Sequence, residues 1–117
     1  MRPNLFRWQW DGYPQFHGNK TNLLIHIIAV PSFVLSFFNV LWSAINLAWQ
    51  PLAFSLGGMM IAFMAQAVGH GQEKNPAIPF NGPLDAVTRI FAEQLFTFPR
   101  FVVSGGWWRA FRAAPPE

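Results

Sequence analysis

The chain has 117 residues, of which 52% are hydrophobic and only 11% are charged, with thirteen Phe, six Trp and no Cys. This length fits a single domain, residues 1–117, and the lack of cysteine excludes disulfides, thiolate metal sites and thiol catalysis. The formal net charge of +3 lies on the flanks of two long apolar runs and forms no basic cluster, so the composition indicates an integral membrane protein and argues against a nucleic-acid partner.

Residues 1–21 mix aromatic and charged side chains, a mixture that is typical of the headgroup zone of a membrane. Gly12, Pro14 and Gly18 argue against one continuous helix here. We therefore predict an N-terminal interfacial segment that carries His17 just outside the first apolar run.

The first apolar run, residues 22–46, carries no formal charge and is long enough to cross the ~30 Å hydrocarbon core of a bilayer as a helix. Its small and polar residues follow one another at steps of three or four, which places them in one stripe of that helix. The stripe consists of Asn22, His26, Ala29, Ser32, Ser36, Asn39, Ser43 and Asn46. A helix in lipid turns such a stripe toward a protein partner, and Pro31 is expected to kink it.

The second apolar run, residues 52–70, is also free of charge, and its small residues recur four apart, as in closely packed membrane helices. The two runs predict an antiparallel transmembrane hairpin. Every Lys and Arg lies on the side of the termini, so the positive-inside rule places both termini in the cytoplasm. The predicted fold class is therefore an all-α membrane protein, with interfacial helices on the cytoplasmic side of the hairpin.

A turn-rich loop follows the hairpin and ends in Pro83, which suits the first turn of a helix. Apolar residues then recur on one face, which predicts an amphipathic helix over residues 83–98 that ends at Pro99. The tail, residues 99–117, mixes aromatic residues with arginines and is too short before its glycine pair to span a bilayer. We predict an interfacial tail.

The candidate site lies where the hairpin ends meet. His70 and Glu73 are three residues apart, and Gln66 lies one turn earlier on the same helical face. His26 lies 23 residues before Trp49, near the midpoint of the hairpin, and His70 lies 21 residues after it. At 1.5 Å per residue the two imidazoles differ in depth by about 3 Å, so they can converge near the cytoplasmic face.

All three histidines, His17, His26 and His70, fall at this end, with Glu73 and Glu93 as nearby carboxylates. Imidazoles with one carboxylate hold non-haem iron for dioxygen chemistry, and the same set can hold zinc. We predict a metal site of His17, His26, His70 and Glu73, with Glu73 and Glu93 as catalytic candidates. The alternatives are a headgroup or backbone hydrogen bond for His17, an interhelical hydrogen bond for His26, and a salt bridge from Glu93 to Arg89.

Two stretches resemble signatures of the Mpo1-like family, the 2-hydroxy fatty acid dioxygenases. They are His17-Gly-Asn-Lys-Thr-Asn22-Leu-Leu-Ile-His26, followed by Pro31, and Gly69-His70-Gly-Gln-Glu73-Lys-Asn-Pro76. The run from Arg89 to Trp107 is similar to the ending of the short bacterial members. The resemblance implies an Fe2+ enzyme of a bacterial inner membrane that shortens 2-hydroxy fatty acids by one carbon with dioxygen, and it maps the three histidines onto those of the family.

In the chemistry that this resemblance implies, the 2-hydroxy acid chelates iron through its carboxylate and hydroxyl, while its tail stays among membrane lipid beside the hairpin. Lys74, Arg89 and Arg100 are candidates to hold the carboxylate, and Asn22 and Gln66 are candidates to support the ligands. Because two spans leave much of the polar stripe uncovered, we also predict a homo-oligomer.

Three other functions stay open at this point. One is a zinc-dependent lipid hydrolase with Glu73 as general base. The others are a non-catalytic hairpin module and a haem carrier with His26 and His70 as axial ligands.

Overall fold

The computed structural model describes residues 2–116, and over that range the chain is helical without any strand. The elements in chain order are α1 (Leu5–Phe16), α2 (Lys20–Ile45), α3 (Trp49–His70), α4 (Pro83–Ala92), the π-helical turn η1 (Glu93–Thr97), α5 (Phe98–Val103) and α6 (Gly106–Ala113). The predicted all-helical class is confirmed.

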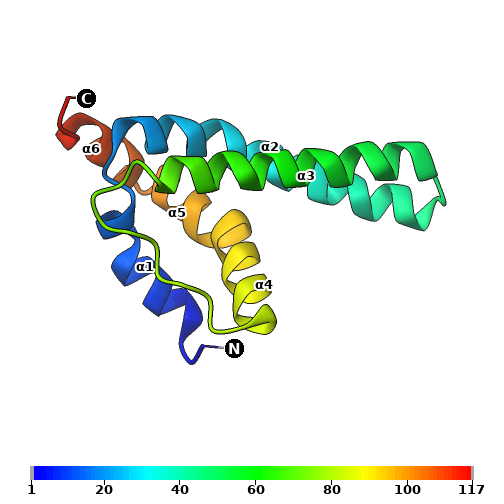
Figure 1. Ribbon diagram of the computed structural model, residues 1–117, viewed down its shortest axis with the longest axis horizontal. Helices are drawn as coiled ribbons and strands as arrows, with labels where there is room; N and C mark the ends of the chain where they lie inside the picture. Colours follow the sequence, from blue (N-terminus) through cyan, green and yellow to red (C-terminus); the bar gives the residue numbers. More distant parts are fainter. Residues whose placement is uncertain (1, 117) are drawn as a thin grey trace.

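Helices α2 and α3 lie side by side and antiparallel, joined by a short turn, and form the long axis of the molecule (Figure 1). With 26 and 22 residues, both are long and apolar enough to cross a membrane. Only 28% and 22% of their most apolar windows are buried, unlike the core helix of a soluble protein. The predicted hairpin is present, and its helices begin two and three residues earlier than expected, at Lys20 and Trp49.

Helix α1 runs through Gly12 and Pro14, so the expectation that these two residues interrupt the segment is wrong. Pro14 is exposed and lies two residues from the end of the helix, where a missing N–H removes only one bond of the last turn. The break comes at His17–Asn19, next to Gly18, and the Asn19 side chain then accepts the backbone N–H of Asn22 to cap the start of α2.

The amphipathic helix predicted over residues 83–98 is expected to end at Pro99. This expectation is also wrong, because the chain stays helical to Val103. The wide turn η1 precedes the proline, and the N–H of Phe98 reaches back to the carbonyl of Glu93. Pro99 has no N–H to give, so a wider turn at this point lets the helix continue around it.

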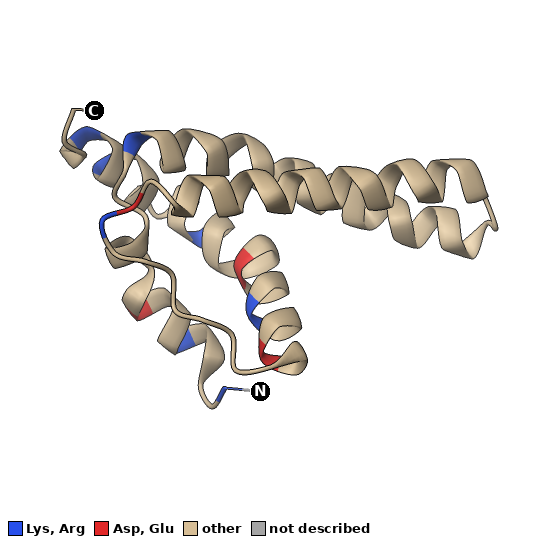
Figure 2. Ribbon diagram, viewed as in Figure 1, with Lys and Arg blue, Asp and Glu red and all other residues tan. Residues whose placement is uncertain are grey.

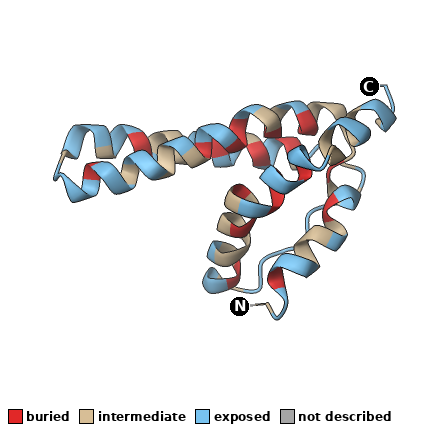
Figure 3. Ribbon diagram, turned by 180° about the vertical axis from the view of Figure 1, so that it is seen from behind, coloured by how far each residue is buried: buried red, intermediate tan, exposed pale blue. Residues whose placement is uncertain are grey.

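The core lies at the open end of the hairpin, where α2 begins and α3 ends. Tyr13, Leu23, Val30, Phe98 and Phe101 form one buried cluster there, and the Trp107 indole of α6 donates to the Leu23 carbonyl at 2.9 Å. Residues 21–72 carry no Asp, Glu, Lys or Arg, and the described charged residues lie just before and along α1, at the start of α2, in the loop after α3, and along α4, η1, α5 and α6 (Figure 2). The half of the hairpin near the turn is mostly exposed (Figure 3).

The close approach of α2 and α3 at the open end is testable at Gly69. A Cβ added there would overlap the side-chain oxygen of Asn22, whose amide is held by Glu73. We expect Gly69→Ala to lower the free energy of unfolding by about 1–3 kcal/mol, measured in detergent micelles.

Gly57→Ala is the matched control on the same helix, because among the described residues an added Cβ there meets nothing within 4 Å. This change should be neutral or stabilising, since Ala favours a helix more than Gly does. Equal losses in the two variants would contradict close packing at Gly69.

Candidate metal centre

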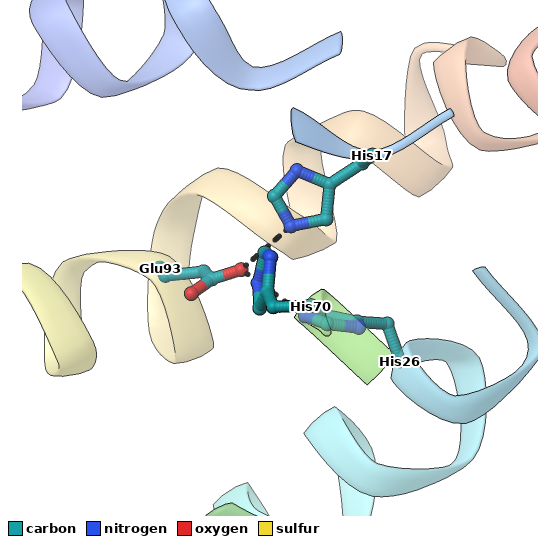
Figure 4. Close-up of side chains that lie close together, drawn as sticks. All are labelled: His17, His26, His70 and Glu93. Carbon is teal, nitrogen blue, oxygen red and sulfur yellow. Dashed lines mark ion pairs between the residues drawn. The ribbon is translucent and has the colours of Figure 1, made fainter. Parts of the chain in front are cut away.

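Four titratable side chains from four segments converge at the open end of the hairpin (Figure 4). His17 lies between α1 and α2, His26 lies in α2, His70 is the last residue of α3, and Glu93 is the first residue of η1. Their potential ligand atoms all lie within 4.8 Å of one another. The structure thus brings together the three histidines singled out in the sequence and adds Glu93 to them.

Backbone carbonyls orient two of the imidazoles. Nδ1 of His17 lies 2.8 Å from the Tyr13 carbonyl, and Nδ1 of His26 lies 3.0 Å from the Asn22 carbonyl. A carbonyl oxygen only accepts, so in each ring Nδ1 carries a hydrogen, and in the neutral ring the lone pair is on Nε2. Both Nε2 atoms therefore face the centre of the group as potential metal ligands.

Nothing in the described part of the chain satisfies these nitrogens by an ordinary hydrogen bond. Nε2 of His17, Nε2 of His26 and Nδ1 of His70 are buried without a hydrogen-bond partner among the described residues. The two Nε2 atoms lie 3.3 and 3.6 Å from Oε2 of Glu93, so lone pairs face a carboxylate. A cation placed between them would satisfy all four side chains, which makes this donor set a fit for a metal ion.

The Glu93 carboxylate is kept charged by its neighbours. Burial alone would raise its pKa, but hydrogen bonds and positive charge from protonated His17 and His26, whose place a bound cation would take, outweigh burial and leave the pKa well below its usual range. Its Oε2 also accepts the hydroxyl of Tyr13 at 2.7 Å. Burial, followed by the negative charge of Glu93, raises the pKa of Tyr13 well above its usual range, so this phenol remains a donor.

Tyr13 is the residue at the site that the sequence prediction missed. Its ring stacks on His17 with centroids 3.7 Å apart, while its carbonyl and hydroxyl contact His17 and Glu93 respectively. One residue thus touches two of the four side chains in three ways. The available signal was the spacing of four between Tyr13 and His17, which places both on one side of a helical turn.

The structure places Glu73 outside this group of four. Its carboxylate accepts the N–H groups of Gly18 and Asn19, both at 3.0 Å, and the side-chain amide of Asn22 at 2.7 Å. A carboxylate is favourable at this position because the N-terminus of a helix carries free N–H groups and a partial positive charge. Glu73 therefore joins the loop after α3 to the start of α2.

Asn22 and Gln66, the two candidates to support the ligands, each form hydrogen bonds near the centre. Asn22 contributes through its carbonyl to His26 and through its amide to Glu73. Gln66 forms two reciprocal amide hydrogen bonds, at 2.9 and 2.8 Å, with Gln94, which follows Glu93 directly; both glutamines are buried. This pair ties α3 to η1 beside two of the potential ligands.

The three cations proposed to hold a substrate carboxylate are not gathered at the centre. Arg89 donates to the carbonyls of Ile78 and Pro79 at 2.9 and 3.1 Å. Arg100 is exposed, with its guanidinium 3.9 Å from the centroid of the Trp10 ring. Lys74 is exposed in the loop after α3.

The comparison with known families gives one result. The family model described as 2-hydroxy-palmitic acid dioxygenase Mpo1-like matches residues 4–99, which include the four side chains of the candidate centre and Tyr13. No curated protein and no solved structure matches the chain.

The contacts of Tyr13 generate a prediction about metal affinity. Tyr13→Phe keeps the ring that stacks on His17 but removes the hydroxyl that holds Glu93. We expect about a 10–100-fold loss of Fe2+ or Zn2+ affinity, measured by competition with a chelator, because partners that orient ligands typically contribute this much.

Trp10→Phe is the control, since Trp10 packs against the same buried cluster but is placed next to Arg100. It should leave metal affinity unchanged. An unchanged affinity in Tyr13→Phe would show that the phenol does not orient the centre.

Proposed function

This chain belongs to the Mpo1-like family, and we propose that it is an iron-dependent membrane dioxygenase that converts a 2-hydroxy fatty acid into the fatty acid one carbon shorter. The observation that carries the proposal is the group of buried His17 and His26 with half-buried His70 and Glu93. Fe2+ held by imidazole and carboxylate ligands supplies the site at which dioxygen is activated. Overall, one 2-hydroxy acid and one dioxygen give the shorter acid, one carbon dioxide and one water, as the C1–C2 bond breaks.

The protein's own side chains hold and shield the centre in this proposal. His17, His26, His70 and Glu93 are the proposed ligands, so Glu93 takes the place that the sequence prediction gave to Glu73. His26 is fully buried and His17 is only 4% exposed, so bulk water is excluded from their side of the centre. Glu73 is proposed as a positioning residue that fixes the start of α2, from which His26 projects nearly two turns later.

We propose that α2 and α3 cross a bilayer. Large apolar side chains along both helices are exposed by more than 60% of their surface; they include Ile28, Leu35, Ile45, Phe54, Ile61 and Val68. A soluble protein rarely leaves so much contiguous apolar surface in water, whereas lipid covers it favourably. The charged residues around the open end favour the inner membrane with both termini in the cytoplasm, which puts the centre near the inner leaflet.

The alternatives receive less support from the geometry. A zinc hydrolase with Glu73 as general base would need a carboxylate that is already bound to Gly18, Asn19 and Asn22. A haem between His26 and His70 would need a flat slot, but their ring centroids are 4.9 Å apart, and the His17 and Glu93 atoms lie within 4.8 Å of both. A non-catalytic hairpin would have to retain this buried ligand group without using it.

The homo-oligomer remains a prediction, although its original reason is weaker. Within the hairpin, Asn39 donates to Ser55, Ser32 donates to the Ile28 carbonyl, and Ser43 is fully buried. The stripe is thus partly covered by the chain itself: Asn22, His26, Ala29 and Ser43 are buried, whereas Ser32, Asn39 and Asn46 stay exposed. A mass measurement of the protein in mild detergent would decide between one copy and several.

The choice of carboxylate is directly testable. We expect protein purified without added metal to contain iron and to convert 2-hydroxy-palmitic acid to the acid one carbon shorter with consumption of dioxygen. Glu93→Gln should lower iron affinity at least about tenfold and abolish turnover, because it removes a charged ligand. Glu73→Gln should keep bound iron but lower the thermal unfolding temperature, because it weakens the cap of α2.

The opposite pattern, with iron lost in Glu73→Gln and kept in Glu93→Gln, would assign the ligand role to Glu73. If the protein instead contains stoichiometric zinc and catalyses hydrolysis, the hydrolase assignment is correct and the dioxygenase assignment is wrong. If the parent protein has neither bound metal nor turnover, the non-catalytic hairpin is the remaining alternative.

The proposed topology can be measured because the chain has no native cysteine. We expect Asn46→Cys, in the hairpin turn, to react with a membrane-impermeant thiol reagent from outside intact cells. Ala113→Cys, at the end of α6, should react only after the inner membrane is opened. Labelling of both from the same side would contradict a two-span hairpin.

A further inference from the structure

A cavity of about 720 Å³ lies beside the candidate metal centre and has no role so far. It is bounded by α1, α3, α4 and the loop after α3, and His17, His70 and Glu93 form part of its wall. Its volume falls within the roughly 300–1,000 Å³ range of small-molecule sites. The cavity is therefore large enough for a ligand that also reaches the centre.

The wall of this cavity away from the centre is mostly apolar, although Gln9, Asp11 and Gln15 of α1 also line it. Six large apolar side chains contribute to it: Trp8, Phe16, Phe63, Ile78, Phe80 and Ile90. Such a lining suits a hydrocarbon chain.

Two of the polar groups in the wall already have partners within the chain. Arg89 is the one cation among the described lining residues, and it is bound to the carbonyls of Ile78 and Pro79. The Gln66 amide is paired with Gln94. Arg89 thereby fastens the loop that closes one side of the cavity, and neither group is left to demand a polar ligand there.

The cavity also borders the surface proposed to contact lipid. Phe63 and Ala67 of α3 line the cavity, and the next residues along the helix, Met64 and Val68, are 61% and 62% exposed. Because consecutive helix residues point about 100° apart, the cavity wall and the lipid-facing surface adjoin along α3. A fatty acid can therefore pass from the bilayer into the cavity with little exposure to water.

We propose that this cavity holds the acyl chain of the substrate, with the 2-hydroxy acid head at His17, His70 and Glu93 and the tail among Trp8, Phe80 and Ile90. The inference rests on the proposed function and deepens it, because it places the tail inside the protein instead of in the bilayer beside the hairpin. The volume of the cavity then selects the length of the acyl chain.

The test uses the full chain in phosphatidylcholine nanodiscs and a sixteen-carbon fatty acid with a photoreactive diazirine near its methyl end. This probe lacks the 2-hydroxyl and is not turned over, so binding is measured apart from catalysis. Mass spectrometry of the labelled peptides is expected to find the probe on Trp8, on residues 77–80 or on Ile90, and an excess of unlabelled hexadecanoic acid should displace it.

Ala67→Leu fills part of the cavity from α3 and should lower this labelling about tenfold or more, since a few methylenes change binding in an apolar pocket by that much. Ala77→Trp fills it from the loop, away from the packed helices, and should act in the same way. Ala53→Leu, at an exposed position of α3 outside the cavity, is the matched control and should leave labelling unchanged.

Labelling confined to the exposed faces of α2 and α3, equal in all variants, would overturn the cavity assignment. Metal affinity is measured on the same samples to separate the two proposals. If the cavity peptides are labelled but the protein binds no iron, the acyl site is supported and the dioxygenase proposal is contradicted. If the protein binds iron and turns over substrate but is labelled only on the outer faces of α2 and α3, the dioxygenase proposal is supported and the acyl site is contradicted.

Discussion

The structure depends on bringing imidazole nitrogens and a carboxylate together in a largely buried place. Nε2 of His17 and Nε2 of His26 face Oε2 of Glu93 at 3.3 and 3.6 Å, an arrangement that lone pairs and a negative charge disfavour unless a cation lies between them. Each neighbouring contact holds this group in position. Tyr13 fixes Glu93 and His17, Glu73 fixes the start of α2, and the Gln66–Gln94 pair fixes η1 against α3. The helices at the open end can therefore be understood as a scaffold for four converging atoms.

Much of the hairpin and of the histidine set could be predicted from the sequence, because both follow from local and countable properties. A charge-free apolar run of sufficient length specifies a span, and equal residue counts from a turn specify equal depth. His26 and His70 meet for this reason, with ring centroids 4.9 Å apart. The position of His17 needed only the break between α1 and α2 next to Gly18.

The carboxylate could not be predicted in this way. Glu73 is near His70 in sequence, but α3 ends at His70 and the chain turns, so the helical face that would join them does not continue. Glu93 is brought to the centre by the packing of α1, α2 and η1, which involves long-range contacts that no local pattern encodes. The wide turn before Pro99 belongs to the same class of feature, because its i−5 bond depends on how the helix is packed on both sides of the proline.

The order of the ligands along the chain has a consequence for biosynthesis. His17 and His26 leave the ribosome before the hairpin can close, and His70 follows at the end of the second span, but Glu93 and the segment that carries it come later still. A growing chain therefore has no complete set of the four side chains until both helices of the hairpin have been synthesised. If the proposed ion binds, it would be acquired late, after most of the chain has been made, and it would then link residues 17 and 93, which are far apart in the sequence.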